Sequence, residues 1–166
     1  MFRKPLAALA VLALPLAAAP ALAHPPQAAV AAASPAQVEV VAVLEGYLAA
    51  VEALDGAAAT AFFWPEAQVY EQGGVEGRFA DYLAHHLGPE LAAFSTFTFA
   101  DHKVEATVVG DIAYATETYR YRIAFKDAAR DPVERRGVAT SVLERRDGRW
   151  RIVRYHSSSR APRPAA

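Results

Sequence analysis

The hydrophobic positions change their period along this chain, from a helical spacing in its first half to a strand spacing in its second. Val40, Leu44 and Leu48 recur every four residues, which predicts a long helix with one apolar face. Ser34-Pro35-Ala36-Gln37 has the form of a capping box with proline in the first turn. We therefore expect the helix to begin at this stretch and to end before Asp55-Gly56.

Shorter elements are expected to follow the long helix. A second helix over 57–63 should stop at Trp64-Pro65, because the residue before a proline is pushed out of helical geometry. A short strand is expected over 67–71, broken by Gly73-Gly74. The apolar spacing of 79–87 predicts a third helix.

From Phe97 onward the apolar residues alternate with polar ones, which is typical of strands. Gly110-Asp111 and Asp147-Gly148 are hairpin-turn signals. The expected strands cover 97–108, 112–125, 137–145 and 149–159, with a polar loop at 126–134. Helices followed by long strands predict an α+β domain. We expect a cone-shaped, curved antiparallel sheet wrapped around the long N-terminal helix, with a pocket at its open end.

The first residues of the chain have the pattern of a secretory signal. Two basic residues precede an apolar run over 6–19, and Ala21-Leu22-Ala23 supplies the small residues of a cleavage site. The run is shorter than the roughly 20 residues that a membrane-spanning helix needs. We therefore expect a mature protein that begins at His24, is periplasmic or secreted, and has no membrane attachment after cleavage.

These patterns divide the chain into four parts. Residues 1–23 are the expected signal peptide, and 24–36 are an Ala/Pro-rich spacer. Residues 37–160 are the expected α+β domain. Residues 161–166 are expected to be a disordered tail.

Composition narrows the classes of function. The formal net charge is −1, from 17 basic and 18 acidic residues, so no basic surface large enough for nucleic acid is expected. With no cysteine, the chain has no disulfide, thiolate metal site or thiol nucleophile. Nothing in the sequence indicates a cofactor.

Three stretches carry a family resemblance: "VYEQGGVEG", "GDIAYATETY" and "RRDGRWRIVRYHSSS". In their order and spacing they resemble the nuclear transport factor 2 superfamily, and within it the SnoaL-like domains and the association domains of calcium/calmodulin-dependent kinases. The resemblance covers about Gln37 to Arg160. It implies the cystatin-like α+β cone described above, a fold that hosts isomerases, cyclases, dehydratases, epoxide hydrolases and assembly modules.

The resemblance to kinase association domains also implies which strand face lines the pocket. Thr116 and Ser141 occupy the positions of pocket arginines in those domains, so an anion-binding pocket is not expected here. If Thr116 points inward, alternation sends its neighbours to the other face. The implied pocket residues are Tyr114, Thr116, Thr118, Ser141, His156 and Ser158. The implied outer residues, expected in a sheet-to-sheet homodimer interface, are Ala115, Glu117, Tyr119 and Tyr121.

Two classes of function stay open. The first is a secreted domain that holds a small molecule in its pocket through shape and a few hydroxyl groups. The second is a proton-transfer enzyme of the isomerase, cyclase or hydratase type. Its acid or base would be His156, which shares a face with Trp150 and Ile152, or Glu117, if a bulge exchanges the strand faces.

The histidines do not predict a metal site. His85 and His86 are adjacent, and neighbouring side chains on an α-helix diverge by about 100°, so we expect them not to bind one ion together. One of them, His86 by its position three after Leu83, could turn toward the pocket mouth. No other metal-ligand spacing occurs in the sequence. After cleavage His24 could bind copper with its free amine, but the flexible Pro/Ala segment behind it argues against such a site.

Overall fold

The computed structural model describes residues 32–162. The expected signal peptide, residues 24–31 of the spacer with His24, and residues 163–166 of the tail lie outside the described residues. Secretion and the four-part division of the chain stay predictions. Within 32–162, no helix has the length and apolar character needed to cross a membrane.

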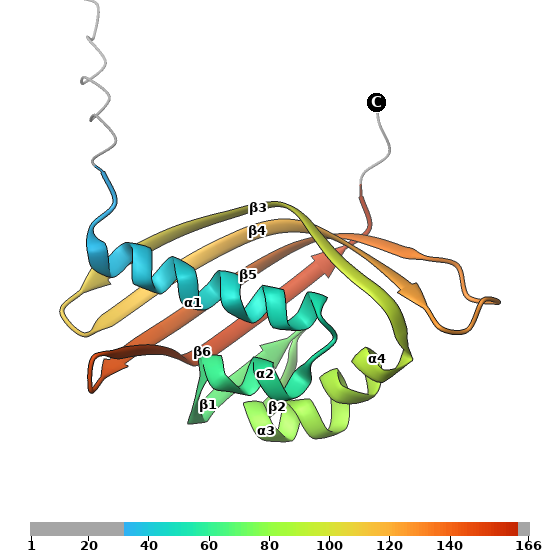
Figure 1. The fold of residues 1–166 in the computed structure, drawn as a ribbon, viewed down its shortest axis with the longest axis horizontal. Helices are drawn as coiled ribbons and strands as arrows, with labels where there is room; N and C mark the ends of the chain where they lie inside the picture. Colours follow the sequence, from blue (N-terminus) through green and yellow to red (C-terminus); the bar gives the residue numbers. More distant parts are fainter. Residues whose placement is uncertain (1–31, 163–166) are drawn as a thin grey trace, which may run out of the picture. The chain divides into compact units, whose positions relative to one another are not determined.

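The long helix α1, Pro35–Glu52, forms as its sequence predicts. Ser34 Oγ accepts a hydrogen bond from the Gln37 N–H at 3.2 Å, and Gln37 Oε1 accepts one from the Ser34 N–H at 2.8 Å, so the capping box is confirmed. Its apolar face is buried at Val40, Leu44 and Leu48. Figure 1 shows α1 lying across the inner side of the curved sheet.

The sheet has six strands in the order β2-β1-β6-β5-β4-β3. Their bounds are β1 Phe63–Glu71, β2 Gly74–Arg78, β3 Phe94–Val109, β4 Ile112–Phe125, β5 Val133–Arg146 and β6 Arg149–Arg160. The strand pairs are antiparallel except β1 with β6, which is parallel. The α+β curved sheet is therefore confirmed, with one parallel pair that the sequence did not predict.

The short helices close one end of the sheet (Figure 1). They are α2 Gly56–Ala59, η1 Thr60–Phe62, α3 Phe79–Tyr82, η2 Leu83–Leu87 and α4 Gly88–Ala93. The expected third helix therefore continues past residue 87 through Gly88. Its middle turn, η2, is a π-helix, in which the backbone is wider than in an α-helix.

The strand ends before Gly73-Gly74 as expected, but the strand β2 begins at Gly74 and was not predicted. Gln72 and Gly73 adopt φ angles of 49° and 89°, the left-handed geometry of a two-residue hairpin turn. The strand β1 also runs through Pro65, and its pairing with β6 shifts register between Phe63 and Gln68. The proline thus falls in an irregular stretch, where no ladder hydrogen bond is lost.

The expected assignment of the β4 faces was also wrong. Ala113, Ala115 and Glu117 are buried, whereas the side chains of Tyr114 and Thr116 are exposed. Helices cover the inner face of the sheet, and the buried alanines belong to the same hydrophobic core as the apolar face of α1. The expected interface residues therefore face the interior of their own chain.

Gly137 on β5 allows a close approach inside the sheet. It is paired with Tyr119 of β4, and an added Cβ at Gly137 would overlap the Tyr119 ring. The tyrosine ring therefore lies against the backbone of the neighbouring strand. Tyr119 also lines the interior cavity, so this contact fixes part of the cavity wall.

We expect Gly137→Ala to lower the free energy of unfolding by about 1–3 kcal/mol, because the new methyl group displaces a packed ring. Urea denaturation of the variant and the wild type measures the loss. In a protein that also carries Tyr119→Ala, Gly137→Ala should lower the free energy of unfolding much less. An equal cost in both backgrounds would show that the ring is not the obstacle.

Candidate functional site

A cavity of about 560 Å³ lies between the inner face of the sheet and the helices. Most of its wall is aromatic or aliphatic. Phe97 and Phe99 of β3 stack with ring centroids 4.8 Å apart, and Phe97 also contacts Tyr121 of β4 at 5.2 Å. Leu48 and Val51 of α1 complete this part of the lining. Such a wall favours apolar, ring-containing molecules.

Three buried tyrosines add polar groups to the cavity wall: Tyr47, Tyr119 and Tyr155. The rings of Tyr47 and Tyr155 meet edge to face at 5.3 Å. Burial raises the pKa of all three phenols above its usual value, so they stay protonated at physiological pH. They can therefore donate hydrogen bonds to an acceptor on a bound molecule.

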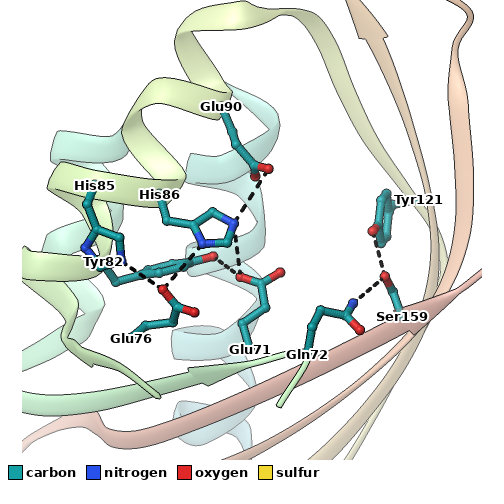
Figure 2. Close-up of polar contacts among 9 residues, drawn as sticks. All are labelled: Glu71, Gln72, Glu76, Tyr82, His85, His86, Glu90, Tyr121 and Ser159. Carbon is teal, nitrogen blue, oxygen red and sulfur yellow. Dashed lines mark hydrogen bonds and ion pairs between the residues drawn. The ribbon is translucent and has the colours of Figure 1, made fainter. Parts of the chain in front are cut away.

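Titratable groups gather at one side of the cavity (Figure 2). The Tyr82 hydroxyl donates to Glu71 Oε2 at 2.6 Å. His86 Nε2 lies 4.0 Å from Glu71 Oε2 and 3.6 Å from Glu90 Oε1. Partial burial raises the pKa of Glu90. The charge of His86 acts against this increase, and the charge of Glu71 adds to it. We call Glu71, Tyr82, His86 and Glu90 the cavity rim.

A second group of contacts lies on the other side of His86 (Figure 2). His86 Nδ1 is 3.4 Å from Glu76 Oε2, and His85 Nε2 is 2.8 Å from the same oxygen. The hydrogen bond between His85 and Glu76 lowers the pKa of Glu76 and raises that of His85. Glu76 and His85 do not line the cavity. Both adjacent histidines therefore contact the same carboxylate oxygen.

A smaller polar chain connects the β1–β2 turn with β4 and β6 (Figure 2). Gln72 Nε2 donates to Ser159 Oγ at 2.8 Å, and the Tyr121 hydroxyl lies 2.9 Å from the same Oγ. Gln72 and Tyr121 line the cavity. This chain supplies a second polar position, apart from the rim.

Glu117 is the most deeply buried charged residue of the interior, with 0% of its surface exposed. Its Oε2 is 2.9 Å from His102 Nε2, whereas Oε1 has no hydrogen-bond partner. A bulge in β3, with Asp101 at φ 54°, lies next to His102 and shifts the register between Ala100 and Lys103. Burial raises the pKa of Glu117, which the hydrogen bond with His102 partly offsets. Glu117 does not line the cavity.

The structure places the expected pocket residues mostly outside the cavity. Ser141 is buried on the inner face but is not in the cavity wall. The other five have exposed side chains on the outer face: Tyr114, Thr116, Thr118, His156 and Ser158. Of the expected interface residues, Tyr119 and Tyr121 line the cavity, and Ala115 and Glu117 are buried behind it. The homodimer itself stays a prediction.

Of the cavity rim, only His86 was expected near a pocket mouth. A second signal was present in the spacing: Tyr82, His86 and Glu90 are four residues apart, which places them on one side of a helix. Glu71 lies within the stretch "VYEQGGVEG", which predicted the end of a strand and carried part of the family resemblance, but not a site. The spacing alone did not show that this side faces a cavity.

Comparisons with known proteins agree on the fold. The sequence profile of the SnoaL-like domain family matches residues 40–162. A nuclear transport factor 2-like superfamily protein from Salmonella enterica is 20% identical, with a TM-score of 0.64, covering 78% of this chain and 92% of its own. No curated protein matches this chain in sequence.

Two further solved structures carry names of enzymes. A provisionally assigned ketosteroid isomerase from Shewanella frigidimarina is 28% identical, with a TM-score of 0.56, covering 70% of this chain and 92% of its own. A provisionally assigned scytalone dehydratase from Novosphingobium aromaticivorans is 12% identical, with a TM-score of 0.64, covering 79% of this chain and 95% of its own. At these identities the similarity supports the fold and does not assign a reaction.

We expect Glu117→Gln to change how stability depends on pH. Because burial raises the pKa of this carboxyl above its ordinary 4.5, the wild type gains stability from the protonated acid at low pH and loses it as the pH rises through the folded-state pKa. Glutamine cannot ionise. The free energy of unfolding of Glu117→Gln, relative to wild type, should therefore increase from acidic to neutral pH.

Urea denaturation at a series of pH values measures this difference. Glu105→Gln is the matched control, since it makes the same chemical change at an exposed position of β3. If the difference in free energy of unfolding between Glu117→Gln and wild type did not vary with pH, the assigned direction of the pKa shift would be contradicted.

Proposed function

Because this chain belongs to the SnoaL-like domain family, with the nuclear transport factor 2 fold, we propose that it binds a small, largely apolar, ring-containing molecule in its interior cavity. The observation that carries the proposal is the cavity of about 560 Å³ with mostly apolar walls and a few polar groups at defined positions. Binding sites for small molecules generally have this size and composition.

The lining defines the chemistry of the molecule. Stacked rings such as Phe97 and Phe99 favour a flat hydrocarbon surface. The protonated phenols of Tyr119 and Tyr155 favour an acceptor such as a carbonyl or hydroxyl oxygen. Carboxyl groups at the rim disfavour an anion there. A neutral cyclic ketone or phenol fits these conditions.

We expect Ala93→Trp, at a cavity-lining position near the end of α4, to weaken binding of 2-naphthol by about tenfold or more, because the indole occupies the cavity. Fluorescence titration with 2-naphthol measures the affinity. Ala92→Trp is the matched control, since Ala92 is exposed like Ala93 but does not line the cavity. Equal affinities for both variants would contradict binding in the cavity.

A second candidate function is proton transfer on the bound molecule. The specific observation is the cavity rim, where the Tyr82 hydroxyl donates to Glu71 at 2.6 Å beside His86. A carboxylate held in this way could remove a proton from carbon next to a carbonyl, and the buried phenols could donate to the resulting enolate oxygen. The earlier candidates fit less well, since His156 is exposed on the outer face and Glu117 does not line the cavity.

For this second candidate we expect the chain to catalyse exchange of the acidic C–H of 2-tetralone with deuterium from heavy water. Glu71→Gln should lower the exchange rate by roughly 100-fold or more, because the base is removed. Proton NMR follows the exchange. The matched control is Glu66→Gln, at an exposed position of the same strand. If wild type gives no exchange above the buffer while 2-naphthol still binds, the protein is a binder and not an enzyme of this kind.

A further inference from the structure

We propose that Glu76, His85 and His86 form a binding site for one zinc ion beside the cavity rim. Each residue offers one ligand atom, and these three atoms lie within 4.8 Å of one another. Two imidazoles and one carboxylate are a common ligand set for zinc, and three protein ligands leave the fourth position to water. Magnesium and calcium prefer sites made of oxygen ligands alone.

Hydrogen bonding at His85 points to a cation. His85 Nδ1 lies 2.5 Å from the carbonyl oxygen of Asp81, which can only accept, so this nitrogen carries a proton. In a neutral imidazole the other nitrogen, Nε2, then has a lone pair. That lone pair faces Glu76 Oε2 at 2.8 Å. Two acceptors at this distance need a second proton or a metal ion between them.

His86 presents the same situation on both of its ring nitrogens. Nδ1 faces Glu76 at 3.4 Å, while Nε2 faces Glu90 at 3.6 Å and Glu71 at 4.0 Å. A neutral imidazole has one N–H and can donate to one side only. A zinc ion at Nδ1 leaves the Nε2 proton for the carboxylates of the rim. Histidine ligands of zinc typically donate their other N–H to a carboxylate in this way.

One of the distances between ligand atoms already suits zinc. Tetrahedral zinc with bonds of about 2.0–2.2 Å holds its ligand atoms roughly 3.3–3.5 Å apart. The distance from His86 Nδ1 to Glu76 Oε2 already has this value. The shorter contact between His85 Nε2 and Glu76 Oε2 can lengthen, because 54% of the His85 side chain is exposed and the ring has room to move. Glu76, with 14% of its side chain exposed, is held in place on β2.

The backbone brings the three ligands together from two elements. Glu76 comes from the hairpin strand β2, and both histidines come from the π-helical turn η2. Figure 2 shows His86 between Glu76 on one side and Glu71 with Glu90 on the other. The zinc position therefore lies outside the cavity, and His86 connects it to the rim.

Calorimetric titration of the full, untagged chain with zinc, after treatment with EDTA and near neutral pH, tests the proposal. We expect one zinc ion per chain. His85→Ala and Glu76→Gln should each weaken binding by roughly 100-fold or more, because each removes a ligand. His156→Ala, at an exposed histidine outside the cluster, should bind as wild type does. All variants also carry His24→Ala, which removes the other candidate ligand of the chain.

Thermal unfolding with and without zinc provides a second measurement. The melting temperature of wild type should rise with zinc, whereas that of His85→Ala should not. Absence of zinc binding by wild type, or equal binding by His85→Ala, would overturn the proposal. A melting temperature that changes with pH but not with zinc would also overturn it and identify the cluster as protonated ion pairs.

The zinc site does not depend on the proposed function, and two variants separate them. Ala93→Trp should lose 2-naphthol and keep zinc, whereas His85→Ala should lose zinc and keep 2-naphthol. Loss of zinc binding in a folded Ala93→Trp variant would overturn the position of the ion outside the cavity.

Discussion

The structure depends on how α1 packs against one curved face of the sheet. At the start of the helix, Gln37 Nε2 donates to the carbonyl oxygen of Ala106 at 2.9 Å, so helix and sheet are in close contact there. Ala106 is paired with Ala115 of β4, and the inward residues of this region are small. Farther along β4 the inward residues become Tyr119 and Tyr121, and the wall of the cavity begins. The change from small to large inward side chains along one strand therefore sets where the interior is filled and where it is hollow.

Glu117 lies at the boundary between these two regions. A buried carboxyl is costly, and here one oxygen is hydrogen-bonded to His102 while the other has no partner. The partner lies beside a bulge in β3, where Asp101 adopts left-handed geometry. A bulge of this kind redirects a side chain that regular alternation would place elsewhere. The buried acid and the irregular strand therefore belong to one feature, which holds the middle of the sheet in a single register.

Local signals in the sequence were sufficient for most of the helices and strands but not for the faces of the strands. The capping box at Ser34 and the turn at Asp147-Gly148 depend on neighbouring residues, so periodicity and turn chemistry predicted them correctly. The inward face of β4 depends on packing with residues distant in sequence, and a shift of one residue exchanges the two faces. The positions taken from the family resemblance were shifted by one residue and therefore assigned the wrong face. Ala113 and Ala115 were the better signal, because apolar residues at alternate positions mark the buried face of a strand.

The meeting of both histidines with Glu76 was not predicted from the sequence, because it depends on how η2 lies beside the hairpin strand β2. In a π-helical turn the Gly88 N–H bonds to the Leu83 carbonyl, five residues earlier, and a Cβ at Gly88 would meet that oxygen closely. Glycine at this position therefore permits the wide turn that carries His85 and His86, and both of these side chains reach the same oxygen of Glu76.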